Sequence, residues 1–149
     1  MSAAAAGGSA GAAESPLAPL LLDTHAWVWW VGSPDDLPPG LRRRVQVALA
    51  EDRLWLSAIS AWEVALLVQR GRLVLRYPVR EWIARSQALA GLRFLPVDTG
   101  IAIRSVELPD LHPDPADRLI VASAERLGAM LVTKDERLRA YPGVATIWD

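Results

Sequence analysis

Short apolar runs alternate with helical patterns along most of the chain. The runs are rich in Leu, Val and Ile, as buried strands are, and lie at residues 20–22, 54–56, 93–97, 129–133 and 144–148. Helical periodicity or helix-stop residues mark the segments between them, at residues 24–31, 41–50, 59–70, 78–91, 99–107, 115–127 and 136–139. This alternation predicts an α/β domain with a central parallel sheet and helices on both faces.

The first residues differ in composition from the rest of the chain. Residues 1–18 are mostly Ala, Gly and Ser, and such a segment cannot bury enough apolar surface to offset the entropy of ordering. We therefore expect a disordered tail at 1–18 and a single domain at 19–149. No apolar run reaches the roughly 18 residues of a membrane helix, and there are no cysteines. These features predict a soluble, cytoplasmic protein with no membrane association.

The charges are unevenly spread, although the formal net charge is only -1. Residues 41–93 contain ten arginines and four acids, so the remaining segments are strongly acidic. Such a distribution suits an enzyme that binds cations in an acidic pocket and a polyanion around it, and equally suits solvated helix faces. The candidates for phosphate contact in the basic segment are Arg42, Arg43, Arg44, Arg70 and Arg72.

Two of the acids follow predicted strands directly. Asp23 comes after the run 20–22, and Asp135 comes shortly after the run 129–133. In open parallel sheets, ligands bind beyond the carboxyl ends of the strands, so these are favourable places for catalytic groups. Each residue also precedes a helix, and N-capping alone would account for it.

Glu63 is harder to explain by structure alone. Its helical neighbours are Ile59, Ser60, Leu66 and Leu67, so its side chain lies on a mostly apolar face. A desolvated carboxylate needs a cation or a hydrogen-bond partner, and a buried arginine would be the structural alternative.

The segment from Asp114 to Ile120 begins a helix and contains two acids. Asp114 is expected at the N-cap with Pro115 at the first helical position, while Asp117 lies in the first turn on the face of Ile120 and other apolar residues. Since Asp114 accounts for the cap, Asp117 is the better candidate for catalysis.

Together the four acids predict a metal site. Carboxylates that share a crevice repel one another, and a hard cation with oxygen ligands, Mg²⁺ or alternatively Mn²⁺, relieves that repulsion. A zinc site is disfavoured, because the only histidines are His25 and His112, which have no clustered ligand spacing and are interpreted as packing or surface residues.

These motifs, in this order, resemble the PIN-domain family. The matching stretches are Leu-Leu-Leu-Asp23-Thr-His, Ser60-Ala-Trp-Glu63, Asp114-Pro-Ala-Asp117-Arg-Leu-Ile and Val-Thr133-Lys-Asp135. The resemblance is to the VapC branch of type II toxins and covers the chain from about residue 20 to 148. The Ala/Gly-rich tail departs from the pattern.

The resemblance implies a specific function. It implies a three-layer PIN fold in which Asp23, Glu63, Asp117 and Asp135 bind Mg²⁺ and carry catalysis, supported by Thr133 and with Asp114 as an outer contributor. It further implies an endoribonuclease that hydrolyses RNA as the toxin of a type II toxin-antitoxin pair, a VapB-like antitoxin partner, and a homodimer.

Two other interpretations remain open from the residues. One is an aspartyl-phosphate phosphatase, which would also be an α/β enzyme with an acidic pocket. Such enzymes have an Asp-x-Asp motif after the first strand, whereas this chain has Asp23-Thr24-His25. The other is a non-catalytic module that binds RNA or protein and in which the acids act only as helix caps.

Tryptophan is abundant, with seven residues. Most are expected in the core. Trp27, Trp29 and Trp30 share one short helix and cannot all point the same way, so at least one is expected to meet a partner, either an antitoxin or a second protomer.

Overall fold

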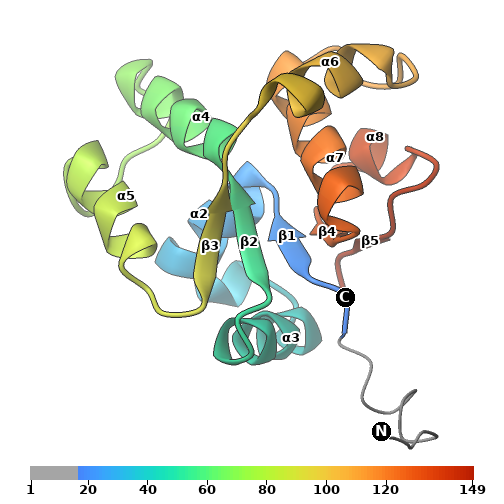
Figure 1. Cartoon of the computed structure of the whole chain (residues 1–149). Coiled ribbons are helices and arrows are strands. Elements are labelled where there is room, and N and C mark those ends of the chain that lie inside the picture. The colour runs from blue at the N-terminus through green and yellow to red at the C-terminus, as the bar shows by residue number, and fades with distance from the viewer. Residues whose placement is uncertain (1–16) are drawn as a thin grey trace, which may run out of the picture.

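The fold is built on a five-stranded parallel sheet, seen in a computed structural model that describes residues 17–149 (Figure 1). The strands lie in the order β3-β2-β1-β4-β5, with β1 in the centre. Their bounds are β1 Leu20–Leu22, β2 Leu54–Ser57, β3 Leu92–Leu95, β4 Met130–Val132 and β5 Thr146–Ile147. The order reverses between β1 and β4, which is where open α/β sheets usually bind ligands.

Helices cover both faces of the sheet. They are α2 Thr24–Gly32, α3 Pro39–Ala50, α4 Ala58–Gln69, α5 Val79–Gln87, α6 Thr99–Glu107, α7 Pro115–Leu127 and α8 Glu136–Arg139, with one 3₁₀ turn at Pro34–Asp36. Figure 1 shows α2, α3 and α5 around one side of the sheet and α6, α7 and α8 around the other. The three-layer α/β/α arrangement predicted from the alternating pattern is thereby confirmed.

The central strand is apolar on both faces, as a doubly covered strand must be. Leu20 and Leu22 pack into a core cluster with Trp27 and other residues of α2, α3 and α5. Leu21 points the other way and packs with Ile120 and Leu131 in the cluster under α6 and α7. Burial of both faces stabilises the sheet and fixes the register of β1 with its two neighbours.

The observed elements differ from the predicted ones mainly at their ends. The run at 93–97 forms a strand only to Leu95, and the run at 144–148 pairs only at Thr146–Ile147. Helix α3 begins at Pro39, two residues earlier than predicted, since a proline at the first helical position needs no amide partner. Helix α7 ends as predicted at Gly128, which has a φ of 62°.

Two other predictions concern the termini and membranes. Most of the predicted tail, residues 1–16, lies outside the described residues, whereas Leu17 and Ala18 are described and precede β1. None of the helices in residues 17–149 has the length and apolar character required to cross a membrane.

The tryptophans are less uniformly buried than predicted. Trp27, Trp30 and Trp82 are in the core, whereas Trp62 is 55% exposed. Trp29 is half-buried, and its indole ring contacts that of Trp148 edge to face with centroids 5.6 Å apart. The prediction that one of the α2 tryptophans meets a partner stays a prediction.

Candidate active site

The sheet register sets three polar residues side by side at the carboxyl end of the central strands. Leu22 pairs with Leu56 on one side and with Val132 on the other. The residues that follow, Ser57, Asp23 and Thr133, are therefore level with one another, and all three are buried. This row forms the floor of the candidate site.

Asp23 is the most deeply placed of the candidate acids, with only 5% of its surface exposed. It caps α2, where one carboxylate oxygen accepts a hydrogen bond of 2.8 Å from the Ala26 amide. Burial raises the pKa of Asp23, and hydrogen bonds from Thr133 and Ala26 oppose that rise only in part. Thr133 thus contacts Asp23, one of the acids that the sequence motifs lead us to expect it to support.

Glu63 reaches the site from α4, whose first turn begins directly after β2. The Thr24 hydroxyl donates a short hydrogen bond to Glu63, and Thr24 also lies 2.9 Å from the Ser60 hydroxyl. Because Thr24 has one proton, the Ser60 hydroxyl must be the donor in the second contact. Burial raises the pKa of Glu63, with further contributions from the charges of Asp114 and Asp23. Its partner is therefore a hydroxyl, and the arginine alternative is not realised.

Two acids come from the start of α7. Asp114 caps the helix by accepting a 2.9 Å hydrogen bond from the Ala116 amide, as predicted. Asp114 also has a carboxylate oxygen close enough to Glu63 and Asp117 for the three to share one ion, since their oxygens lie within 4.8 Å of one another. Capping and membership of the acidic cluster are thus compatible in Asp114.

The pKa of Asp117 is strongly perturbed by burial and by its neighbours. Burial and the negative charges of Glu63, Asp114, Asp23 and Asp135 raise the pKa of Asp117 to about 8. The residues following it on the inner face of α7, Ile120 and Val121, are fully buried, as the helical pattern predicts. Asp117 therefore sits where several anions converge.

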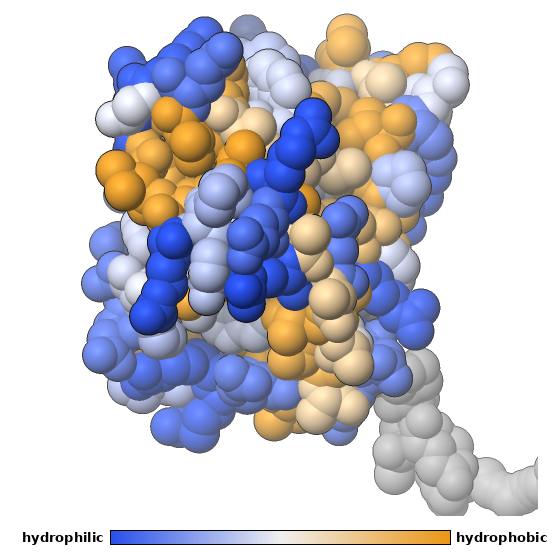
Figure 2. Space-filling model, turned by 90° about the vertical axis from the view of Figure 1, so that its left-hand side faces the viewer, coloured by the Kyte–Doolittle hydropathy of each residue, from blue (hydrophilic) through white to orange (hydrophobic). Residues whose placement is uncertain are grey.

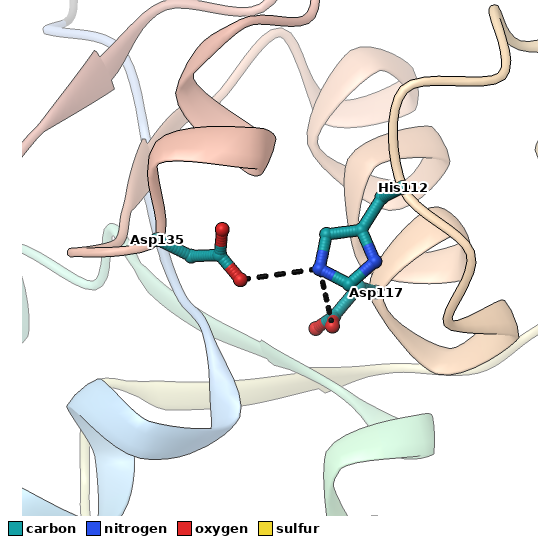
Figure 3. Close-up of side chains that lie close together, drawn as sticks. All are labelled: His112, Asp117 and Asp135. Carbon is teal, nitrogen blue, oxygen red and sulfur yellow. Dashed lines mark hydrogen bonds and ion pairs between the residues drawn. The ribbon is translucent and has the colours of Figure 1, made fainter.

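Asp135 lies opposite, at the N-cap of α8, where it accepts a 2.8 Å hydrogen bond from the Arg137 amide. Partial burial alone would raise the pKa of Asp135, but hydrogen bonds from Arg137 and His112 outweigh it and lower the pKa. Figure 3 shows that Asp135 and Asp117 both approach the same nitrogen of the His112 ring, Nε2, which lies 3.1 Å from an oxygen of Asp135 and 3.2 Å from one of Asp117. His112 is thus a part of the site, although no spacing typical of metal ligands in the sequence indicated this.

The protonation of His112 follows from its other ring nitrogen. The Asp114 backbone amide donates a hydrogen bond of 3.1 Å to Nδ1, and a backbone N–H can only donate. Nδ1 is therefore unprotonated, and in the neutral ring the proton is on Nε2, facing the two carboxylates. In this tautomer His112 donates its Nε2 proton to Asp135, with an oxygen of Asp117 also close to Nε2, and Nε2 has no free lone pair for a metal ion.

The loop that carries His112 is fixed by Arg118 and Tyr141. The Tyr141 hydroxyl accepts a hydrogen bond of 3.1 Å from the His112 amide. The Arg118 guanidinium donates to the Leu108 carbonyl at 2.8 Å and to the Pro109 carbonyl at 3.0 Å, and it also contacts Tyr141. One largely buried cation thereby connects the end of α6, the loop and the segment after α8.

The structure brings together all the acids that the sequence singles out, Asp23, Glu63, Asp114, Asp117 and Asp135, at one end of the sheet. It does not bring the basic helix α3 to the same place. Arg43 and Arg44 line a hollow with Leu20 and Met130, the first residues of their strands, and so lie at the amino end of the sheet. Arg42 pairs with Asp35 at 2.7 Å. Arg43 and Arg44 therefore lie at the end of the sheet opposite the acids.

Sequence reasoning missed four polar residues of the site, and Ser57 in its floor is one of them. Thr24 and Ser60 connect α2 to Glu63, and His112 connects Asp117 to Asp135. The only signal for His112 was its position two residues before the capping Asp114.

Comparisons with known proteins agree with the fold. The family model of the PIN domain matches residues 20–144. Ribonuclease VapC22 of Mycobacterium tuberculosis (strain ATCC 25618 / H37Rv) is 38% identical over 132 residues, which span 87% of this chain and 98% of that protein.

Two solved structures have similar folds at low sequence identity. The DNA-bound VapBC of Salmonella typhimurium aligns with a TM-score of 0.64 and 21% identity, covering 89% of this chain and 100% of that chain. VapBC2 of Rickettsia felis, bound to a DNA fragment from its promoter, aligns with a TM-score of 0.66 and 18% identity, covering 87% of this chain and 98% of that chain.

Proposed function

The chain belongs to the PIN-domain family, and from this we propose that it is a metal-dependent endoribonuclease, the VapC-like toxin of a type II toxin-antitoxin pair. The observation that carries the proposal is the convergence of acids on Asp117. Burial of Asp117 and the charges of four neighbouring carboxylates raise its pKa to about 8. The similarity to a protein named as a ribonuclease over most of the chain supports RNA as the substrate.

The acidic cluster suits a divalent cation, because its donors are carboxylate oxygens and a cation would remove their mutual repulsion. Asp23, Glu63, Asp117 and Asp135 are proposed to bind Mg²⁺, with Mn²⁺ as a substitute. Asp114, whose carboxylate lies close to those of Glu63 and Asp117, is proposed to contribute from outside this set. No thiolate is available, and the His112 tautomer leaves carboxylates as the ligands.

A bound divalent cation supplies charge neutralisation at the scissile phosphate and lowers the pKa of an attacking water. The protein's own groups orient the carboxylates that surround it. Thr24 donates to Glu63, Thr133 to Asp23, and Nε2 of His112 to Asp135, while an oxygen of Asp117 lies 3.2 Å from the same nitrogen. These fixed donors restrict the rotation of each carboxylate, so that the cluster is organised before the substrate arrives.

The direct test is RNA cleavage with Mg²⁺ by the wild type and by Asp117→Asn and Asp23→Asn. Both changes remove a charge while keeping the side-chain shape, and we expect cleavage to fall by at least about 100-fold. Asp36→Asn, which removes a charge from an exposed position, is the control and should cleave normally. Undiminished cleavage by the two site variants would contradict the proposal.

A metal titration separates the enzyme from a non-catalytic module whose acids only cap helices. For the enzyme, Mn²⁺ should raise the melting temperature of the wild type but not of Asp135→Asn, because an ion stabilises only a fold that binds it. Equal stabilisation of both proteins, or of neither, would favour the non-catalytic module.

A VapB-like antitoxin is the partner we propose, since the solved structures with this fold are named as VapBC complexes. Figure 2 views the molecule from the side of α4 and α5 and shows hydrophobic residues gathered in patches on the surface. A groove of about 680 Å³ between α2 and α5 has the exposed apolar residues Val31 and Val74 in its lining. Such a patch is typical of a protein-binding surface. The homodimer stays a prediction.

A further inference from the structure

A second feature lies next to the acidic cluster, on the side of β5. It is a shallow hollow of about 460 Å³ lined by Trp148, Lys134, Arg139, Glu136 and Ala140. Lys134 stands between Thr133 and Asp135 in the chain, so part of the lining comes from the segment that carries Asp135. The hollow therefore borders the place where the scissile phosphate would bind.

The two cations of the hollow are available to a ligand. Lys134 and Arg139 are exposed, and neither forms an ion pair with an acid of residues 17–149. The Lys134 ammonium lies 5.9 Å from the centre of the Trp29 ring, which keeps it close to the aromatic residues. Glu136 is the one acid of the lining, so two positive charges face one negative charge.

The aromatic residue of the hollow is half-buried and held by its neighbour. Trp148 packs edge to face on Trp29 at 5.6 Å, and Trp29 in turn lies 5.8 Å from the exposed His25 ring. His25 is close enough to Asp23 and Glu63 for its charge to influence their pKa values. Aromatic rings thus extend from the hollow to the acidic cluster.

We propose that this hollow, formed by Trp148, Lys134 and Arg139, is a subsite for an unpaired nucleotide that flanks the scissile phosphate of single-stranded RNA. Trp148 offers a ring for base stacking, while Lys134 and Arg139 contact the phosphate backbone. Paired bases already stack on each other and cannot enter, so the subsite selects single-stranded over double-stranded RNA. The inference rests on the proposed ribonuclease function and assigns its phosphate contacts to Lys134 and Arg139 instead of to α3.

The test measures RNA binding in the full chain by fluorescence anisotropy. An Asp117→Asn background in EDTA suppresses cleavage. The probe is a short labelled single-stranded RNA, compared with a blunt duplex of the same sequence. In this background, Lys134→Ala with Arg139→Ala should weaken binding of the single strand roughly ten-fold. The slope of log affinity against log salt should become shallower by about 0.7 for each phosphate that the protein no longer neutralises.

A matched control is available at the opposite end of the sheet. Arg43→Ala with Arg44→Ala removes the same charge from the amino-end hollow and should leave binding within about two-fold, because non-specific attraction falls off within a Debye length of roughly 10 Å. Equal weakening by the two double variants would overturn the proposal, since it would mean that only net charge matters. Unchanged RNA binding by both double variants would also overturn the proposal. It would indicate that Lys134 and Arg139 bind another polyanion, such as an acidic partner peptide.

The stacking role has its own pair of variants. Trp148→Leu should weaken single-strand binding about 5- to 100-fold, whereas Trp148→Phe keeps a ring and should retain most of the affinity. Melting temperatures of both variants separate a loss of stacking from a loss of fold. Equal binding by Leu and Phe variants would contradict stacking. If instead the wild type cleaves no RNA with Mg²⁺, the proposed function itself is wrong, independently of these binding results.

Discussion

The backbone amide of Asp114 donates a hydrogen bond to Nδ1 of His112, and this single interaction assigns the proton of the ring to Nε2. His112 therefore acts on the acidic cluster as a donor. A histidine ligand would need the opposite tautomer, whose Nδ1 proton would face the Asp114 amide proton.

The donor role of His112 can be separated from a packing role by two substitutions. His112→Ala removes the donor, and we expect Mn²⁺ affinity to fall on the order of ten-fold, as it does when a partner of metal ligands is removed. His112→Gln returns an N–H group near the position of Nε2 and should recover most of that affinity. Calorimetric titration measures both constants, and equal decreases in the Ala and Gln variants would contradict the donor role.

The tautomer itself is open to observation. In ¹⁵N-labelled protein, the chemical shifts of the His112 ring nitrogens should identify protonated Nε2 and unprotonated Nδ1, and Mg²⁺ should leave that pattern unchanged. Loss of the Nε2 proton on addition of Mg²⁺ would show that His112 is a ligand.

Asp117 makes the metal-free protein sensitive to alkaline pH. Its pKa is about 8 in the folded state against 3.8 ordinarily, so folding favours the protonated acid. The free energy of unfolding should therefore fall as pH rises from about 4 to about 8, and level off above that. In EDTA at pH 8, Asp117→Asn should be more stable than the wild type. Each kcal/mol gained in the free energy of unfolding should raise the melting temperature by roughly 2–4 °C.

The comparison at low pH supplies the control for this prediction. Near pH 4 both proteins carry an uncharged side chain at position 117, and their melting temperatures should converge. A constant difference at all pH values would indicate a packing effect and contradict the electrostatic account.

Metal binding should release a proton from the same residue. Near pH 7 a folded Asp117 with a pKa of about 8 is mostly protonated, and a cation requires the ionised carboxylate. Titration calorimetry with Mn²⁺ in two buffers of different ionisation enthalpy measures the number of protons released. We expect close to one proton at pH 7 and fewer at pH 9, and a pH-independent value of zero would contradict the raised pKa.

Arg118 should be important for stability although it contacts none of the acids of the cluster. Its guanidinium donates to carbonyls at the end of α6 and in the loop of His112. Arg118→Ala leaves these acceptors without a donor, and we expect a decrease of about 3 kcal/mol or more in the free energy of unfolding. Urea unfolding measures it. Arg118→Lys should not restore stability, because an ammonium cannot reach carbonyls on several sides at once.

Local patterns were sufficient for much of the fold. The apolar triplet at 20–22 and the acid after it predicted a buried strand with a candidate catalytic residue at its end, because ligands bind beyond the carboxyl ends of strands in open parallel sheets. Helix ends were predicted where proline or glycine fixes them, as at Pro115 and Gly128. The edge strand β5 was overestimated, since an apolar run does not reveal how much of it has a partner to pair with.

The site residues that sequence reasoning missed depend on distant contacts. His112 joins the acids only because Tyr141, 29 residues away, and Arg118 fix its loop. The positions of the α3 arginines were likewise invisible, because charge alone does not say which end of a sheet a helix covers. The aromatic and cationic hollow required the register of β4 and β5 to bring Lys134 near Trp148.

The central position of β1 has a consequence for synthesis on the ribosome. Leu21 pairs with Trp55 on one side but must wait for Leu131 on the other, so the middle strand of the sheet keeps an open edge until most of the chain has been translated. Asp135 follows that late strand. A nascent chain therefore gains Asp135 only after β4 has been translated, so the acidic cluster is incomplete until the second edge of β1 is paired.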